Sequence, residues 1–279
     1  MTESDVFEQS ITRKYRAKIW SKFVSGIKTY KLLEPGDHVC VCISGGKDSM
    51  ILARLFKQLL KHSDFDFKVT YLVMNPGYNE KNLELIKHNL NILDIPAEIV
   101  DTNIFEIAYA QDRSPCFLCA KMRRGALYNF AKQRGCNKIA LGHHYDDVIE
   151  TTLMNMLNSG SFQTMLPKLK STNYEGMELI RPLYLVREKD IISWANYHNL
   201  QFLQCACKFT EEIKNSESGV GESQRAATKA LIKELMKNYN SQVEKNIFTS
   251  ASNVTLDMIL GYKENGIKHS FLDDYDKDK

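Results

Sequence analysis

The chain has 279 residues, of which 43% are hydrophobic and 25% charged, and its formal net charge is +3. This is the composition of a globular protein whose core needs no disulfide bridges, and the small positive charge neither requires nor excludes a nucleic-acid partner. No apolar run is long enough to cross a membrane, and the first residues lack the pattern of a secretion signal. We therefore expect a cytoplasmic protein with no membrane partner.

The first predicted element is a helix over residues 11–30, because apolar side chains recur every four residues from Tyr15 to Ile27. Its other faces carry the cations Arg13, Lys14, Arg16, Lys18 and Lys22. These cations form either a solvated face or a face that contacts phosphates. A Glu-Pro-Gly-Asp sequence at 34–37 ends the helix. We therefore treat residues 1–34 as a separate N-terminal basic helix.

From residue 35 to residue 200, predicted strands alternate with predicted helices. The strands are expected at 38–43, 67–74, 97–100 and 138–141, and the helices at 50–62, 80–93, 120–134 and 146–157. This alternation predicts an α/β domain over 35–200, with a parallel sheet flanked by helices. Such sheets bind ligands beyond the C-terminal ends of their strands.

A loop rich in small residues follows the first strand directly and leads into a helix. It consists of Ser44, Gly45, Gly46, Lys47, Asp48 and Ser49. The glycines allow a sharp turn and a close approach, while the N–H groups at the start of the helix favour an anion. The two serines add hydroxyl donors and the lysine adds a cation. The spacing differs from a Walker A loop and from a dinucleotide fingerprint, and the alternative is a tight turn without a ligand.

A second polar loop, Leu141 to Asp147, follows the strand at 138–141. Asp146 and Asp147 suit the start of a helix, but carboxylates beside a triphosphate would also hold Mg²⁺. The adjacent histidines at 143 and 144 invite a zinc site, but neighbouring residues of a strand point to opposite faces.

Four of the seven cysteines form two short motifs, a C-x-x-C at Cys116 and Cys119 and a C-x-C at Cys205 and Cys207. In a reducing compartment such motifs more often bind metal or do chemistry than form disulfides. Four thiolates suit a structural zinc, whereas three thiolates on an iron–sulfur cluster leave one iron open. The other three cysteines, Cys40, Cys42 and Cys136, are expected to be buried as small apolar side chains.

Both polar loops carry a family resemblance. The sequence SGGKDS resembles the phosphate loop of the PP-loop ATP pyrophosphatases, and LGHHYDD resembles the second signature of that family. The resemblance implies an adenine nucleotide α-hydrolase-like fold that binds ATP, with adenine near Met74. The implied ATP-binding residues are Ser44, Gly45, Gly46, Lys47, Asp48, Ser49, Met74, Gly142 and Asp147.

Longer stretches resemble the tRNA 2-thiocytidine biosynthesis family, from Cys116 to Gly160, from Met165 to Asp190 and again from Ser223. This resemblance implies an ATP-dependent 2-thiolation of a cytidine in the tRNA anticodon loop, through base adenylation, Mg²⁺ and a three-cysteine [4Fe-4S] cluster. It also implies a homodimer, and a sulfur donor that is either a cysteine desulfurase or free sulfide.

The implied cluster ligands are Cys116, Cys119 and Cys205, which with Lys47 and Asp48 form the catalytic set. The family varies between C-x-x-C and a single Cys-Pro-Tyr where this chain has C-x-C. Cys207 therefore competes for the third position.

Arg123 and Arg124 follow the C-x-x-C closely, and they are candidates for contacts to tRNA phosphates or ordinary exposed arginines. Residues 201–268 should hold the late cysteines and C-terminal helices, one of them at 222–239. The hydrophilic stretch 208–221 is a candidate lid, and the charged residues 269–279 should form a disordered tail.

Three alternatives are weighed, and the motifs argue against the second and the third. A wobble-uridine thiolase would show the same motifs. A lysidine-type ligase would need no cysteine cluster. A zinc-stabilised RNA-binding module would have no use for a phosphate loop.

Overall fold

The structure is a computed structural model that describes residues 3–110, 115–203 and 224–275. The chain packs as two compact units. Unit 1 contains Met1–Val148 and Met165–Glu222, and unit 2 contains Ile149–Thr164 and Ser223–Lys279. The four segments expected from the sequence stay a prediction. The candidate lid at 208–221 lies outside the described residues.

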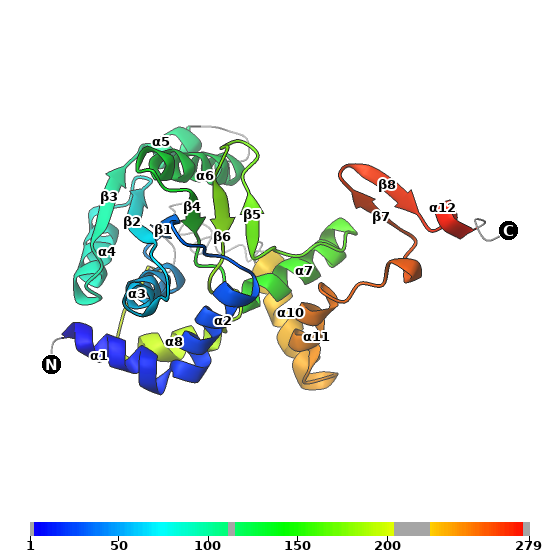
Figure 1. Cartoon of the computed structure of the whole chain (residues 1–279), viewed down its shortest axis with the longest axis horizontal. Coiled ribbons are helices and arrows are strands. Elements are labelled where there is room, and N and C mark those ends of the chain that lie inside the picture. The colour runs from blue at the N-terminus through cyan, green and yellow to red at the C-terminus, as the bar shows by residue number, and fades with distance from the viewer. Residues whose placement is uncertain (1–2, 111–114, 204–223, 276–279) are drawn as a thin grey trace, which may run out of the picture. The chain divides into compact units, whose positions relative to one another are not determined.

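The sheet that the described residues of unit 1 form has six strands (Figure 1). The strands are β1 (His38–Ile43), β2 (Lys68–Asn75), β3 (Ala97–Asp101), β4 (Lys138–Ala140), β5 (Lys168–Lys170) and β6 (Glu178–Ile180). Their order is β3-β2-β1-β4-β6-β5, and only β5 pairs antiparallel within this sheet. The predicted α/β class is confirmed. The sequence did not predict β5 and β6, which have three residues each.

The strand order reverses at β1, which pairs with β2 on one side and with β4 on the other. Open α/β sheets bind ligands at such a switch point, because the loops after the two strands diverge there. The two polar loops singled out in the sequence follow β1 and β4, so both begin at this point.

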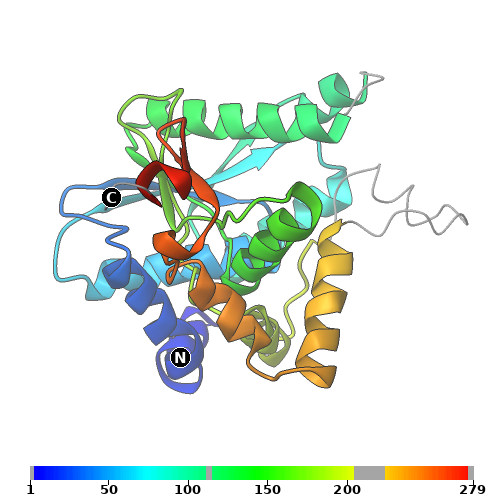
Figure 2. The ribbon, with the colours of Figure 1, turned by 90° about the vertical axis from the view of Figure 1, so that its right-hand side faces the viewer.

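Helices cover both faces of the sheet, as alternate residues of β1 demonstrate. Val39, Val41 and Ile43 face a core that includes α3 (Lys47–His62), α4 (Glu80–Ile92) and α8 (Glu188–Tyr197). Cys40 and Cys42 face a second core with Cys136 and α6 (Pro115–Gln133). The burial expected for these three cysteines is confirmed. Figure 2 shows α6, in green, along one side of the strands and the N-terminal helices, in blue, on the other.

One predicted helix of unit 1 begins earlier than expected, and two further helices were not predicted. The helix expected from residue 120 begins at Pro115, so the C-x-x-C lies inside its first turns. Proline suits this position because its missing N–H would have no helical partner. The helices α5 (Ile104–Tyr109) and α8 were not predicted, and α8 proves to carry a residue of the candidate site.

The N-terminal helix predicted over 11–30 has the expected extent but not the expected type. It continues α1 (Glu3–Gln9) through two π-helical turns, η1 (Ser10–Lys14) and η2 (Arg16–Trp20), into α2 (Ser21–Thr29). The buried apolar residues are spaced by four, namely Phe7, Ile11, Tyr15, Ile19, Phe23 and Ile27.

The spacing of these apolar residues accounts for the π-helical turns. In an α-helix a spacing of four rotates each side chain about 40° past the previous one, roughly 200° from the first to the last. Wider π turns cancel this drift, so the whole row stays buried on one side. Single-sequence periodicity does not distinguish the two helix types here, because a spacing of four fits both over a short window.

This N-terminal segment packs on α8 through a small polar cluster around Ser10. The Ser10 hydroxyl donates to the Phe7 carbonyl at 2.8 Å and accepts from Trp194 Nε1 at 3.1 Å. His198 Nε2 lies 2.8 Å from the same oxygen, whose one proton is already committed, so Nε2 must be the donor. Burial, with a smaller contribution from Lys14, lowers the pKa of His198 to about 4.

Unit 2 contains the predicted C-terminal helices and a β-hairpin that the sequence did not predict. Its elements are the later part of α7 (Tyr145–Ser159), α10 (Gln224–Asn238), α11 (Val243–Ser250), the 3₁₀ turn η3 (Leu256–Met258), β7 (Gly261–Glu264), β8 (Ile267–Ser270) and α12 (Leu272–Tyr275). Arg225 Nη1 donates to the buried Glu150 carboxylate at 3.1 Å and ties α10 to α7 within this unit. In the predicted disordered tail, the described residues 269–275 include the end of β8 and α12.

Among the described residues, no helix combines the length and the apolar character needed to span a membrane.

Candidate active site

The loop after β1 is shaped to hold an anion. Gly45 has φ +86°, a conformation that favours glycine, and a Cβ there would collide with Ile86 and Leu203. The Ser49 hydroxyl donates to the Gly46 carbonyl at 2.9 Å and accepts from Ser44 N at 3.1 Å. Within the described residues, no side chain caps the first turn of α3. The N–H groups of that turn therefore remain directed at a ligand.

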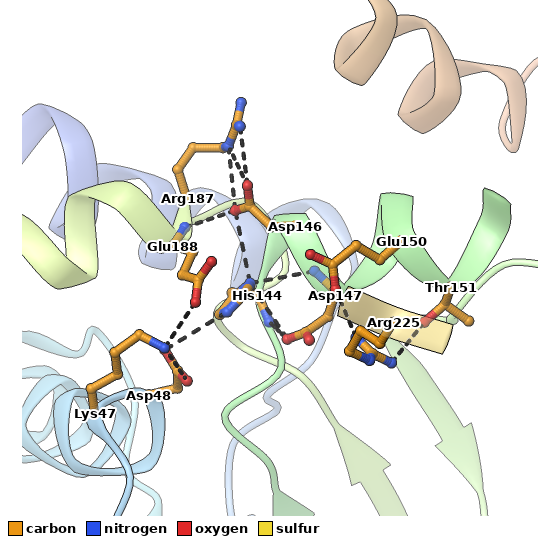
Figure 3. A network of polar contacts seen from close by, with 10 residues as sticks. All are labelled: Lys47, Asp48, His144, Asp146, Asp147, Glu150, Thr151, Arg187, Glu188 and Arg225. Atoms are coloured by element: carbon orange, nitrogen blue, oxygen red, sulfur yellow. Dashed lines mark hydrogen bonds and ion pairs between the residues drawn. The ribbon is translucent and has the colours of Figure 1, made fainter. Parts of the chain in front are cut away.

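Lys47 is held between two carboxylates from different elements (Figure 3). Its Nζ lies 3.1 Å from Asp48 Oδ2 and 3.0 Å from Glu188 Oε1, at the start of α8. Burial disfavours the charged lysine, but Asp48 and Glu188 outweigh it, so the pKa of Lys47 is raised. Lys47 is therefore a fixed cation beside the anion-binding turn. Glu188 was not among the predicted site residues.

Asp48 combines a buried oxygen with a perturbed pKa. Burial raises the pKa of its carboxyl, and the nearby His144 and Lys47 offset only part of that effect. Asp48 Oδ1 is buried and lacks a hydrogen-bond partner within the described part of the chain, with His144 Nε2 3.8 Å away. Buried carboxylate oxygens normally have a partner, so this atom is available to a ligand.

His144 and Asp147 form a reciprocal cap at the start of α7. The Asp147 carboxylate accepts from His144 N at 2.9 Å, and His144 Nδ1 accepts from Asp147 N at 3.4 Å. This is a capping box with histidine and aspartate in place of the usual pair. Because Nδ1 is an acceptor, the proton of a neutral His144 sits on Nε2, which faces Asp48. The cap, rather than zinc, explains why these residues lie together.

Gly142 lets the end of β4 approach the phosphate loop. A Cβ on Gly142 would lie 2.9 Å from the Asp48 carbonyl carbon and 3.0 Å from Ser49 N. Both are backbone atoms that cannot move aside easily. Gly142, a predicted ATP-binding residue, therefore matters in this structure because any larger residue would collide with the phosphate loop.

Asp146 binds the start of α8 rather than facing the cavity. It accepts from Arg187 Nη2 at 3.0 Å and from the Glu188 backbone N–H at 2.7 Å, contacts that Figure 3 draws. Asp146 thereby positions Glu188 against Lys47. Arg187 also lies over the Tyr145 ring, at 4.9 Å from its centroid.

A cavity of about 490 Å³ opens beside these residues, a volume suited to a small molecule. It lies at the C-terminal ends of β1, β2 and β4 and reaches α6. The lining residues are Cys42, Ile43, Ser44, Gly46, Asp48, Ser49, Met74, Ala120, Arg123, Arg124, Leu127, Ile139, Leu141, Gly142, His143, Asp147 and Leu179. Most of the predicted ATP-binding residues are in this set. Arg123 and Arg124 also line it, the second of them exposed.

Tyr78 joins the phosphate loop to the cysteine-bearing helix. Its hydroxyl donates to the Ser44 carbonyl at 3.2 Å. Burial raises the pKa of Tyr78, a hydrogen bond and the charge of Arg123 oppose that rise, and Cys119 adds to it. Tyr78 therefore connects the loop with Arg123 of α6, and Cys119 lies one helical turn before Arg123 in the same helix. In the sequence, Tyr78 shows only its place shortly after a strand, and Glu188 shows only its place in the stretch Met165 to Asp190 that carries the family resemblance.

The other predicted metal ligands are only partly described. Cys116 lies three residues before Cys119 in α6, and its side chain lies outside the described part of the chain. Cys205 and Cys207 lie outside the described residues. Within the residues that are described, no three His, Cys, Asp or Glu side chains are grouped to hold a metal ion.

Comparisons with known proteins agree with this site. The sequence profile of the PP-loop domain family matches residues 21–213. The tRNA-cytidine(32) 2-sulfurtransferase of Shewanella loihica is 33% identical over 264 residues, which cover 91% of this chain and 78% of that protein. This chain belongs to the tRNA-cytidine(32) 2-sulfurtransferase family of PP-loop enzymes.

A second relative and one solved structure are consistent with that assignment. The protein of the same name from Vibrio parahaemolyticus is 32% identical, over 91% of this chain and 84% of its own length. The U34-tRNA thiolase NcsA from Methanococcus maripaludis, solved with its [4Fe-4S] cluster, has a TM-score of 0.64 at 20% identity, over 88% of this chain and 80% of its own. That likeness supports the fold. The chain is thus an ATP-using enzyme of the tRNA sulfurtransferase class.

Proposed function

We propose that this enzyme replaces the 2-oxygen of cytidine 32 in the tRNA anticodon loop with sulfur, at the expense of ATP. The position and the base come from the names of its relatives. The observation that carries the proposal is a single cavity lined by both the phosphate loop and α6, the helix that bears the C-x-x-C.

ATP would bind with its β- and γ-phosphates on the loop and its adenine near Met74, which is buried at the end of β2. The N–H groups of the first turn of α3 and the cation of Lys47 would receive the phosphates. Asp147 lines the cavity and, with phosphate oxygens, would suit Mg²⁺. Asp48 Oδ1 is a second candidate oxygen for that ion.

The first reaction would be adenylation of the base. The cytosine 2-oxygen attacks the α-phosphorus, a new P–O bond forms, and the bond to the β-phosphate oxygen breaks. Pyrophosphate leaves with the electron pair, and the loop donors and Lys47 stabilise its charge. AMP is then a good leaving group at C2, where oxide was a poor one. The fixed position of Lys47 limits reorganisation during this step.

The residues fit an iron–sulfur cluster as far as they are described. Cys116 and Cys119, three positions apart in α6, would supply two thiolates, and Cys205, or Cys207 in its place, would supply the third. A [4Fe-4S] cluster with three protein ligands provides an iron position that can carry sulfide. Arg123 of α6 is joined to the loop through Tyr78, and Cys119 lies one helical turn before Arg123.

The target cytidine would have to leave the base stack to enter the cavity, which is possible in a single-stranded loop. Arg124 is exposed and lines the cavity, so it is the better candidate for a tRNA phosphate. Arg123 is engaged with Tyr78. We further propose that the enzyme is a cytoplasmic homodimer. Its sulfur donor would be a cysteine desulfurase or free sulfide.

The test is nucleoside mass spectrometry of tRNA from a deletion strain, complemented with the wild-type chain or with Asp48→Ala. We expect 2-thiocytidine to return with the wild type only. Loss and return of 2-thiouridine instead would favour a wobble-uridine thiolase. Iron and zinc analysis of the anaerobically purified protein distinguishes an iron–sulfur cluster from a structural zinc. If the protein contains zinc and no iron, the proposed sulfur transfer through a cluster is wrong.

A further inference from the structure

The N-terminal helical segment and the turn after it, residues 10–33, expose a strongly cationic surface on the sides away from the buried apolar row, which is called the cationic face below. Between Gln9 and Leu33 the sequence has seven lysines and arginines and no acidic residue. The exposed cations are Arg13, Lys14, Arg16, Lys18, Lys22, Lys28 and Lys31. None of them takes part in the ion pairs found within the described part of the chain.

The π-helical turns are what keep these cations outside. Tyr15 N bonds to the Ser10 carbonyl at 2.8 Å, five residues back, so the backbone is widened at the start of the cationic stretch. The apolar row therefore remains on the core side from Phe7 to Ile27, all below 10% exposed. In a continuous α-helix the row would wind around and carry some cations toward the core.

The segment is also held rigidly along α8. Tyr15 Oη donates to the Ser193 carbonyl at 2.9 Å, and Lys14 Nζ lies 3.3 Å from the centroid of the Tyr197 ring. The helix α8 begins at Glu188, which binds Lys47. The cationic face thus belongs to the same unit as the cavity and packs on a helix that starts there.

We propose that this face, Arg13, Arg16, Lys18 and Lys22 above all, binds the phosphate backbone of the tRNA, an inference that rests on the proposed function. A set of exposed cations with no acidic residue between them in the sequence and no ion pair among the described residues gives sequence-independent, salt-sensitive affinity for nucleic acid. An anionic membrane is the poorer fit. Membrane-surface helices insert an apolar face, and no large apolar side chain between Ser10 and Tyr30 is exposed in the described structure.

The experiment compares two fourfold variants of the full-length protein. One carries Arg13→Gln, Arg16→Gln, Lys18→Gln and Lys22→Gln. The control carries Lys81→Gln, Lys87→Gln, Lys132→Gln and Lys170→Gln, which are exposed positions elsewhere in unit 1. Both remove four positive charges from a chain of net charge +3. The affinity for a fluorescent tRNA transcript is measured across a salt series.

We expect the first variant to bind tRNA at least about tenfold more weakly at low salt, with a slope of log Kd on log salt reduced by about 3, since each lost phosphate contact removes roughly 0.7–0.9. The control should keep the wild-type slope. Thermal unfolding verifies that both variants fold. Equal losses in both variants, or an unchanged slope in the first, overturn the proposal.

Vesicles of phosphatidylcholine and phosphatidylglycerol test the membrane. Vesicle binding that the first variant loses, with tRNA binding intact, also overturns the proposal. The tRNA-binding experiment and the cellular 2-thiocytidine measurement test different proposals, so either proposal can be rejected without the other. A chain that makes no 2-thiocytidine but binds tRNA through this face would sink the proposed function and leave the binding face standing.

Discussion

The two sides of the cavity are organised in different ways. On the phosphate-loop side, the loop after β1, the start of α7 and the start of α8 are joined by direct contacts among Lys47, Asp48, Asp146, Asp147 and Glu188 and their partners. On the α6 side, Cys119 is half-buried and Phe117, two residues before it, is 72% exposed.

The phosphate-loop side is fixed by contacts among its own side chains, whereas the α6 side presents a half-buried cysteine near an exposed phenylalanine. This difference follows from what each side would bind. A phosphate is held by backbone N–H groups and by cations that the fold itself can fix before the ligand arrives. Thiolates are drawn together by the metal that they bind, so metal binding and local ordering are coupled. Substitutions on the two sides should therefore separate ATP chemistry from sulfur chemistry.

The largest effect should come from Cys119→Ala. We expect thiolated tRNA to fall by more than about 100-fold, since losing even a residue that only supports a metal ligand costs 10–100-fold. Cluster absorbance and iron content should be lost, while pyrophosphate release with tRNA and ATP stays within a few-fold. Cys136→Ala is the matched control, because Cys136 is a buried cysteine of the second core. Full thiolation by Cys119→Ala would contradict the assignment of sulfur chemistry to the α6 side of the cavity.

Lys47→Ala should give the reciprocal result. Pyrophosphate release should fall by about 100- to 1,000-fold, the range for removing one group that stabilises developing charge. Iron content and the visible spectrum should match the wild type. Lys61→Ala, near the other end of α3, serves as the control. If Lys47→Ala also loses its iron, the two sides are not independent.

Glu188→Gln should have a smaller effect on the same side. Glutamine keeps the size of the side chain but removes one of the two negative charges that hold Lys47. We expect kcat for pyrophosphate release to fall by about tenfold with little change in the KM for ATP, as for a positioning residue behind a reacting group. Asp190→Asn removes a charge from the same helical turn as a control. An unchanged kcat would mean that Asp48 alone positions Lys47.

The smallest expected effect is on the free energy of unfolding, and it comes from a residue that lies on neither side of the cavity. The pKa of His198 is about 4 in the folded chain and 6.5 as a free side chain. Between these values the unfolded state binds more protons, so the free energy of unfolding should decrease as the pH falls from about 6.5 toward 4. His198→Gln, which can still donate to Ser10, should flatten this part of the pH profile. Urea unfolding at several pH values measures it, and identical slopes would reject the assignment.

Much of the fold was predictable because it depends on local pattern. Strands β1 to β3 and helices α3, α4 and α7 are long enough to show a pattern, and much of the cavity lining lies at or just after strand ends. Short elements such as β5 and β6 were not predictable, because their three residues form a strand only when a neighbour completes the hydrogen bonds. The C-terminal hairpin is mostly exposed and shows no apolar alternation to detect.

The sequence by itself determined which polar groups stand at the ends of β1 and β4, because each loop follows its strand directly and a glycine-rich turn before a helix is suited to an anion. Only the tertiary structure decided that Glu188 and Tyr78 complete this site. They lie 141 and 34 residues from Lys47 and Ser44, their respective partners, and no local rule connects such distant positions. The π-helical turns of the N-terminal segment were also decided by tertiary structure, because packing against α8 favours the helix type that keeps the apolar row buried.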